Sequence, residues 1–208
     1  MPVMSQRRSE VKSQRALYLS ETAIEVGEKP NLLSRLSAEE YLEVRECGRK
    51  VIVESGDHAF RQGEPHEGIF IIESGSVRTY YIGPSGREIT LAYWTPGYFV
   101  GGPEVFGGGE HIWSGVAVQR SRLLHLKGAE IERLMTRLPP LAIGIVEGLV
   151  FKGKCYSALL HLLGTRSVVE RVAQLLLTLA ELEGKIISTG VHIARPVMHE
   201  EIAAMVGA

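Results

Sequence analysis

The sequence has little cysteine, no strong charge imbalance and no long apolar run. Its two cysteines, Cys47 and Cys155, form no CxxC pair, zinc spacing or disulfide framework, which fits a reducing, cytoplasmic setting. No apolar run approaches the roughly 20 residues that cross a bilayer, and the amino terminus lacks the apolar core of a signal peptide. A formal net charge of −1 offers no electrostatic argument for nucleic-acid binding, so that function must be argued from architecture.

What is present is an ordinary globular composition. The 208 residues are 45% hydrophobic and 23% charged, enough for one large domain or two small ones. Residues 1–30 carry several basic side chains with little apolar periodicity, which predicts an arm that is either a DNA-contacting tail or a solvated terminus. Asn31 to Leu36 predicts a short helical turn. Ser37, followed by Glu40, has the spacing of a capping box that opens a helix over Ala38 to Cys47.

Residues 48–127 contain short β-rich runs separated by turn glycines. The runs are KVIVE, GIFIIE, SVRTYYI, REITLAYW, SGVAVQ and RLLHL. Regular short strands of this kind predict an antiparallel sandwich or barrel. The stretch from Gly97 to Gly109 interrupts the rhythm with six glycines, a composition that either wraps a ligand closely or forms a loose loop.

The long stretch 139–164 predicts a helix around which the rest of the chain is arranged. It opens with two prolines, which suit a first helical turn, and closes on Gly164, which suits the position just past a helix end. Apolar residues recur three and four positions apart, which is typical of a helix that packs against a twin. An ordinary buried core helix is the alternative. The predicted seam consists of Ala142, Ile145, Leu149, Lys152, Tyr156, Leu159 and Leu163.

Two further helices follow. Ser167 is placed as the N-cap of an amphipathic helix that ends at Glu183, and short extended segments are expected between Gly184 and Pro196. HEEIAAMVGA begins a last helix at His199, although Met198 is an unusual residue at its cap.

Four motifs in this order resemble the cyclic-AMP-receptor and fumarate–nitrate-regulator family (the CRP/FNR family) of bacterial transcription regulators. They are QGEPHEGIFIIESGSV, GREITLAYWTPGYFVGG, SVVERVAQLLLTLA and HEEIAAMVG, with the long helix between the second and third. The resemblance covers residues 32–208. It implies an α+β fold with a β jelly-roll sensor domain, a long dimerisation helix and a C-terminal winged helix-turn-helix. The implied partners are palindromic DNA, a small-molecule effector, a second copy of the chain and RNA polymerase.

The expected domains are an N-terminal arm (1–30), the sensor domain (31–138), the dimerisation helix (139–164) and a partial DNA-binding domain (165–208). The resemblance implies a turn and a recognition helix after Ala208, so the helix-turn-helix would be truncated before the helix that enters the major groove. Residues 165–208 hold four Lys or Arg against five Glu, so this part is not basic. At the helix starts, Arg166 and His199 are the predicted contacts to DNA phosphates.

The resemblance also implies a ligand pocket between residues 101–114 and the long helix. Its predicted residues are Gly101, Gly102, Pro103, Glu104, Trp113, Ser114, Tyr156 and Ser157. Where family members that bind cyclic nucleotides carry a glutamate for the ribose and an arginine for the phosphate, this chain has Gly102 and Trp113. A phosphate without a guanidinium loses water and gains little, so we expect an apolar or aromatic effector other than cyclic AMP. Arg87 or Arg122 could restore phosphate binding by reaching in from another strand.

We expect no enzymatic activity. The jelly roll is shared with cupin metalloenzymes, but His58, His66, His111 and His125 contain no closely spaced pair that would bind a metal. No cofactor is expected with certainty; His111 could ligate haem, as in some sensors of the family, or could be an exposed loop histidine. The clustered cysteines of the iron–sulfur members are absent. The alternative function is a stand-alone ligand-binding jelly-roll module that does not bind DNA.

Overall fold

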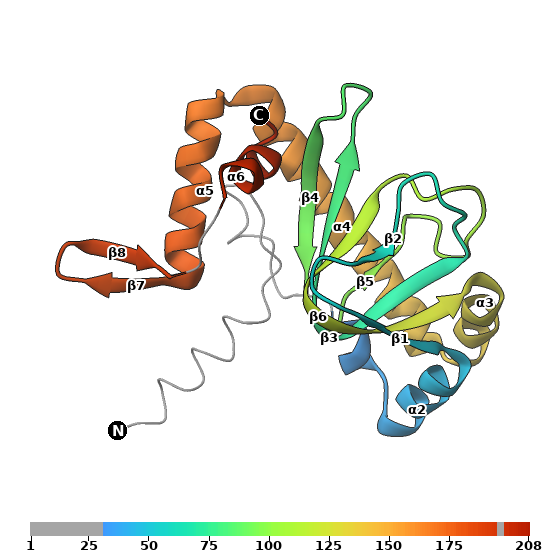
Figure 1. Cartoon of the computed structure of the whole chain (residues 1–208). Coiled ribbons are helices and arrows are strands. Elements are labelled where there is room, and N and C mark those ends of the chain that lie inside the picture. Colours follow the sequence, from blue (N-terminus) through green and yellow to red (C-terminus); the bar gives the residue numbers. More distant parts are fainter. Residues whose placement is uncertain (1–30, 195–197) are drawn as a thin grey trace, which may run out of the picture.

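The computed structural model describes residues 31–194 and 198–208 (Figure 1), so the predicted arm at 1–30 lies outside the described residues. Two short helices come first, η2 (Leu32–Arg35) and α2 (Ala38–Cys47). The predicted capping box at the start of α2 is confirmed. Ser37 Oγ accepts from the Glu40 N–H at 3.1 Å, and the Glu40 carboxylate accepts from the Ser37 N–H at 2.8 Å.

An antiparallel sheet forms the centre of the molecule. Its strands are β1 (Arg49–Val53), β2 (His58–Phe60), β3 (Gly68–Ile82), β4 (Glu88–Trp94), β5 (Phe99–Val100) and β6 (Ser114–Lys127). The main path runs β1-β6-β3-β4, with β2 paired to β6 and β5 paired to β3. The two long strands β3 and β6 are neighbours along most of their length, so they carry the contacts that hold the sheet together.

β3 and β6 each join two runs that the sequence predicted as separate strands. The turn expected at Gly75 is instead an irregularity within β3, where the register against β6 shifts around Ser74 and Ser76. Gly75 has a φ of +91°, and a Cβ there would lie 2.2 Å from Ser121 Oγ, so only glycine fits. Such bulges bend a strand and increase its twist, which lets the sheet curl around its own core.

Two helices follow the sheet, α3 (Gly128–Arg137) and α4 (Pro139–Thr165), and α4 runs diagonally behind it (Figure 1). The predicted start of the long helix is confirmed, because both prolines occupy its first turn. Its end differs by one residue. Gly164 is still helical, and the cap is Arg166 in an extended conformation, so Gly164 is not a left-handed cap.

The last described elements are α5 (Val168–Glu183), β7 (Gly184–Ile187), β8 (Gly190–Ile193) and α6 (His199–Val206). The predicted cap of α5 is confirmed by a capping box between Ser167 and Glu170, and the expected extended segments form the β7–β8 hairpin. In Figure 1, α6 lies between α5 and β4. A small apolar cluster joins α4, α5 and α6, and Tyr93 of β4 packs against it.

Candidate functional site

An aromatic cluster fills the space between the sheet and α4. Tyr98 stacks on Phe151 of α4 with ring centroids 5.5 Å apart, and Trp94 lies 5.5 Å from Tyr98. Trp113 and Tyr156, which the sequence placed in the ligand pocket from distant segments, are also 5.5 Å apart. The structure therefore brings together the two aromatic residues predicted for the site, within one core cluster. Aromatic walls of this kind favour an apolar or aromatic ligand.

Three polar groups are buried inside this aromatic cluster. Lys152 is 7% exposed, and its Nζ lies 3.5 Å from the centroid of the Trp94 ring. The hydroxyls of Tyr98 and Tyr156 are buried and have no hydrogen-bond partner among the described residues. Burial lowers the pKa of the Lys152 amine to about 7, and burial raises the pKa of both tyrosines. The sequence predicted Lys152 in the dimer seam and gave Tyr98 no role. These buried polar groups were therefore not predicted as part of the site.

The loop at 101–111 packs against the loop that follows β2. Backbone hydrogen bonds join them, from the His66 N–H to the Gly109 carbonyl at 3.0 Å and from the His111 N–H to the Glu64 carbonyl at 2.8 Å. This loop therefore wraps against its neighbour and is not loose. Of the predicted pocket residues, Gly101 and Gly102 are buried beside His66, whereas Pro103 and Glu104 are exposed on the outer side.

His111 is 5% exposed, which overturns its description as an exposed loop histidine. Its Nδ1 lies 2.6 Å from the Gly101 carbonyl oxygen, and its ring stacks on Phe60 at 4.5 Å and meets His66 edge-on at 4.4 Å. Burial lowers the pKa of both His66 and His111, so the neutral imidazole is favoured in this loop. Haem binding by His111 remains a prediction. Among the described residues, no group of three or more His, Cys, Asp or Glu side chains could hold a metal ion.

Four polar residues considered for ligand binding, two serines and two arginines, do not point free side chains into the aromatic cluster. Ser114 Oγ accepts a hydrogen bond from the Gln62 N–H at 3.0 Å, and Ser157 is exposed on the opposite side of α4. A ligand contact of Ser157 remains a prediction. Arg122 is exposed and donates from Nε to Ser74 Oγ at 3.0 Å, and Arg87 lines a cleft elsewhere. Neither arginine supplies the positive charge that a cyclic phosphate requires.

Three residues of the predicted dimer seam are buried within the chain itself, whereas dimerisation remains a prediction. Ile145, Lys152 and Leu159 are only 2%, 7% and 8% exposed because they pack on the protomer's own core, so a partner cannot reach them. The other seam residues, Ala142, Leu149, Tyr156 and Leu163, are half-buried. The exposed outer face of α4 consists of residues that each follow a predicted seam position by one residue in the sequence. It exposes Ile143 (50%), Val146 (55%), Val150 (53%) and Leu160 (71%), which follow the same heptad spacing.

Both predicted phosphate contacts lie at helix starts. Arg166 directly precedes Ser167, the N-cap of α5, and its guanidinium is 3.8 Å from the Glu170 carboxylate. His199 is the exposed first residue of α6. The unusual cap of α6 uses only half of a capping box, in which the Glu201 carboxylate accepts from the Met198 N–H at 3.2 Å. Phosphate binding at these positions remains a prediction.

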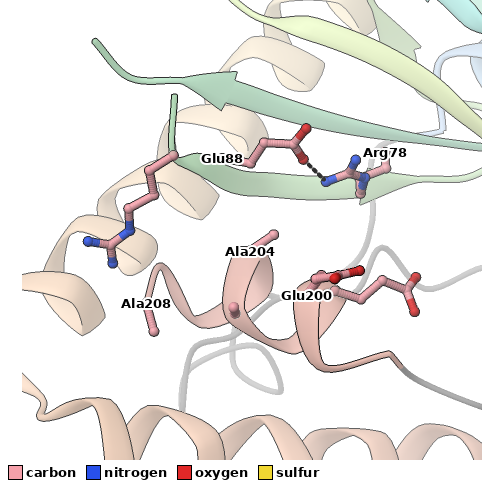
Figure 2. A pocket seen from close by; sticks show the side chains of 8 residues that line it. Arg78, Glu88, Glu200, Ala204 and Ala208 are labelled. Atoms are coloured by element: carbon pink, nitrogen blue, oxygen red, sulfur yellow. Dashed lines mark hydrogen bonds and ion pairs between the residues drawn. The ribbon is translucent and has the colours of Figure 1, made fainter. Parts of the chain in front are cut away.

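A cleft that the sequence did not suggest lies between α6 and the β3–β4 hairpin (Figure 2). Its volume is about 480 Å³. Arg78 and Arg87 line one side, and Glu200 and Glu201 of α6 line the other. Arg78 is already engaged, because it forms an ion pair with Glu88 at 3.1 Å. The mixed charges of the walls do not select a ligand of one sign.

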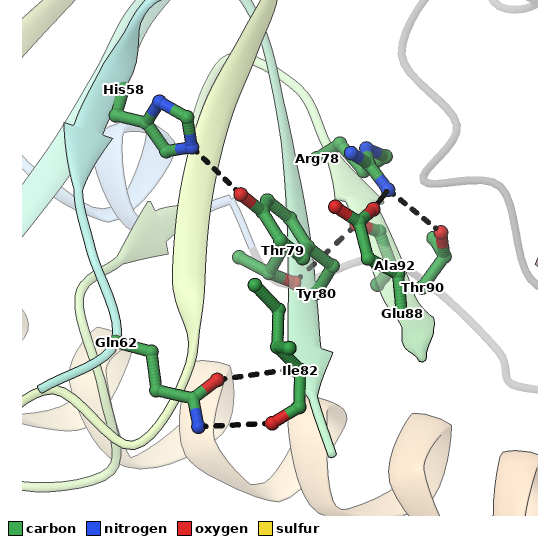
Figure 3. A network of polar contacts seen from close by, with 9 residues as sticks. All are labelled: His58, Gln62, Arg78, Thr79, Tyr80, Ile82, Glu88, Thr90 and Ala92. Carbon is green, nitrogen blue, oxygen red and sulfur yellow. Dashed lines mark hydrogen bonds and ion pairs between the residues drawn. The ribbon is translucent and has the colours of Figure 1, made fainter. Parts of the chain in front are cut away.

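Figure 3 shows how polar contacts brace β3 beside this cleft. Gln62 makes two hydrogen bonds to the backbone of Ile82, and His58 lies 2.7 Å from the Tyr80 hydroxyl. Arg78 donates to both Glu88 and Thr90 and lies over the Tyr80 ring. These contacts tie the loop after β2 and strand β4 to the outer half of β3.

The curled antiparallel sheet closed by a long helix defines a jelly-roll-like α+β fold of the cyclic-nucleotide-binding type, and the family model "Cyclic nucleotide-binding domain" matches residues 50–137. The chain is 30% identical over 152 residues to the cyclic AMP receptor protein of Thermus thermophilus, across 73% of this chain and 67% of that protein. It is 27% identical over 153 residues to the CRP-like cAMP-activated global transcriptional regulator of Mycobacterium tuberculosis, across 74% of this chain and 68% of the regulator. The chain belongs to the CRP/FNR family, as the order of its motifs predicted.

The fold agrees with that family. The c-di-GMP responsive global regulator CLP of Xanthomonas campestris has the same fold, with a TM-score of 0.69 at 19% identity over 82% of this chain and 85% of that chain. The Mycobacterium tuberculosis relative is by name a global transcriptional regulator. Among residues 31–194 and 198–208, no helix is both long enough and apolar enough to cross a bilayer.

Proposed function

We propose that this chain is the effector-binding and dimerising part of a ligand-responsive, homodimeric transcription regulator, which as the full-length protein binds palindromic DNA in the cytoplasm and acts on RNA polymerase; for the 208 residues alone we expect no sequence-specific DNA binding. The observation that carries the proposal is the outer face of α4. This apolar stripe of heptad spacing lies between a closed sensor domain and a second helical unit, and nothing in the described chain covers it. A second copy of the same helix would bury it along its whole length.

In this proposal, the sensor cluster and the DNA-binding unit communicate through α4. Tyr156 and Phe151 contact the effector cluster from the inner side of the helix, while Ile143, Val150 and Leu160 meet the partner on the outer side. An effector that shifts the inner contacts would therefore also bias the dimer contact. Residues 165–208 would form part of a winged helix-turn-helix, with Arg166 and His199 as phosphate contacts.

The dimer is tested by placing a charge on the outer face. Val150→Glu would bury an unpaired carboxylate in the interface, at a cost of about 3–5 kcal/mol. We expect sedimentation velocity to show a dimer for the natural protein and a monomer for this variant. The matched control is Ile52→Glu, which puts the same charge on an equally exposed apolar residue of β1. A Val150→Glu protein that sediments as the natural dimer would remove α4 as the interface.

DNA binding is tested separately, on the full-length gene product. Selection from random duplexes should enrich a palindrome whose half-sites lie about one helical turn, roughly 34 Å, apart. The Val150→Glu variant should lose most of this binding, because a monomer contacts only one half-site. If no palindromic sequence is enriched, with or without cell extract as a source of effector, the stand-alone sensor module becomes the better description.

A further inference from the structure

We infer that the effector is a small aromatic carboxylate, held by the Lys152 ammonium and the hydroxyls of Tyr98 and Tyr156. The inference rests on the proposed function, because it names the ligand class of the sensor cluster. It is argued from the buried amine of Lys152 and from two buried hydroxyls that have no hydrogen-bond partner among the described residues.

The first group is the amine of Lys152. It is 7% exposed, and no carboxylate of the described residues lies within 4.0 Å of it. Its neighbours are the faces of Trp94, at 3.5 Å from the ring centroid, and Phe99, at 5.0 Å. A cation over aromatic rings regains less free energy than the burial of the ion costs. The aromatic rings therefore compensate only part of the cost, and an anion would supply the rest.

The second and third groups are the phenol hydroxyls of Tyr98 and Tyr156. Each is buried without a hydrogen-bond partner among the described residues, although a buried hydroxyl that makes no hydrogen bond destabilises the folded protein. Trp94 contacts both the Lys152 amine, at 3.5 Å from its ring centroid, and the Tyr98 ring, at 5.5 Å, and Tyr156 follows Lys152 by one helical turn and packs against the same cluster. All three groups can donate a hydrogen bond, and neither hydroxyl has a partner among the described residues.

A carboxylate matches this set of donors. It accepts up to about four hydrogen bonds through two oxygens, and a bond from an ammonium group is charge-assisted and short. The surrounding rings of Trp94, Trp113 and Phe151 give the body of the ligand an aromatic environment. A cyclic nucleotide matches less well, because its ribose and phosphate require the carboxylate and guanidinium that are replaced here by Gly102 and Trp113.

Carboxylate binding also has a proton signature. With a pKa of about 7, the free Lys152 amine is mostly neutral at pH 8. A bound carboxylate favours the ammonium form and raises this pKa, so binding at pH 8 takes up a proton. Calorimetry in two buffers of different ionisation enthalpy measures this uptake directly. A ligand held only by apolar contacts would leave the measured enthalpy independent of the buffer.

The experiment is isothermal titration of the full chain with benzoate and 3-phenylpropionate, and with benzamide as the neutral isostere of benzoate. We expect one of the acids to bind at least about tenfold more tightly than benzamide, a difference of roughly 1.4 kcal/mol. Lys152→Met, which keeps the volume of the side chain, should abolish the preference. Lys154→Met is the matched control, because Lys154 is exposed on the same helix, and it should keep the preference.

Four results would overturn the inference. They are equal binding of benzamide and benzoate, a preference for acids that survives Lys152→Met, tighter binding of cyclic AMP than of either acid, and no binding of either acid at about 10 mM. Tyr98→Phe removes a single hydroxyl and provides a milder second test, with an expected weakening of about fivefold or more. If the outer-face variants of α4 behave as proposed while no acid binds, the regulator proposal stands and only the effector class is wrong.

Discussion

The sensor part and the C-terminal part of this chain differ in how completely they bury their apolar side chains. On the sensor side, residues of the sheet, α3 and α4 form two large clusters, with Trp94, Leu124 and Leu141 fully buried. On the other side, α5 and α6 share a small cluster around Leu175 and Leu179. Burial of apolar area is the main source of stability, so the first part is held by its own core.

The C-terminal part leaves many apolar side chains uncovered by the described residues. Val169 is 78% exposed, Leu177 is 59% exposed, and Ile186 at the β7–β8 hairpin is 91% exposed. Its contact with the sensor is narrow and depends on Tyr93 and the packing of α6 beside β4. The two parts can therefore differ in stability, and the contact between them is weaker than the packing inside the sensor core. Segments that move in regulation are drawn from such weakly held regions.

The largest expected effect comes from making the same Leu→Ala substitution in the core of each part. Leu124→Ala in β6 should cost about 4–5 kcal/mol of the free energy of unfolding, because the neighbouring sheet residues cannot collapse into the cavity. Leu175→Ala in α5 should cost about 2–3 kcal/mol, because a small, partly open cluster relaxes more easily. Both side chains are completely buried, so the pair is matched. Urea unfolding followed by circular dichroism measures both, and equal losses would contradict the difference between the cores.

Acid should lower the folding stability of the sensor part in particular, because this part contains buried histidines. Burial lowers the pKa of His66, His111 and His125 below the usual 6.5, so below pH 6.5 the unfolded chain binds more protons than the folded one. The sensor's stability should therefore be complete above pH 6.5 and decrease as the pH falls through the region below it.

Thermal unfolding at pH 7.5 and pH 5.5 provides the measurement. His125→Phe should reduce the loss, because a phenyl ring keeps the stacking on Phe70 at 4.4 Å and cannot take up a proton. A melting temperature of the natural protein that does not change between the two pH values would exclude this role for the histidines.

The smallest expected effects come from two matched helix caps. Ser37 caps α2 in the sensor part, and Ser167 caps α5 in the C-terminal part, each through a capping box. Each Ser→Ala substitution should cost about 1 kcal/mol. If the two parts unfold separately, Ser37→Ala will weaken protection of sensor amides from hydrogen exchange, and Ser167→Ala will weaken only those of α5 and α6. A uniform loss of protection in both variants would show that the chain unfolds as one unit.

The sequence leaves the faces of α4 ambiguous. Apolar residues occur on several faces of this helix, so the heptad spacing fits two adjacent registers. Gly144 and Gly148 were the available signal. A Cβ at Gly148 would lie 2.6 Å from the Phe99 ring, and one at Gly144 would lie 2.6 Å from Leu32, so these glycines mark the face that approaches the sensor core. The outer face is the remaining one.

The order of the elements, the caps at Ser37 and Ser167 and the family could be predicted from the sequence. These depend on local spacing and on motifs, which are properties of neighbours along the chain. The contact of Trp113 with Tyr156 was implied by the family resemblance, whereas the inward turn of Lys152 onto Trp94, the burial of His111 and the exposure of Val150 follow from the tertiary structure. Whether a side chain is covered depends on segments far away in the sequence, and no local pattern records which of them arrive.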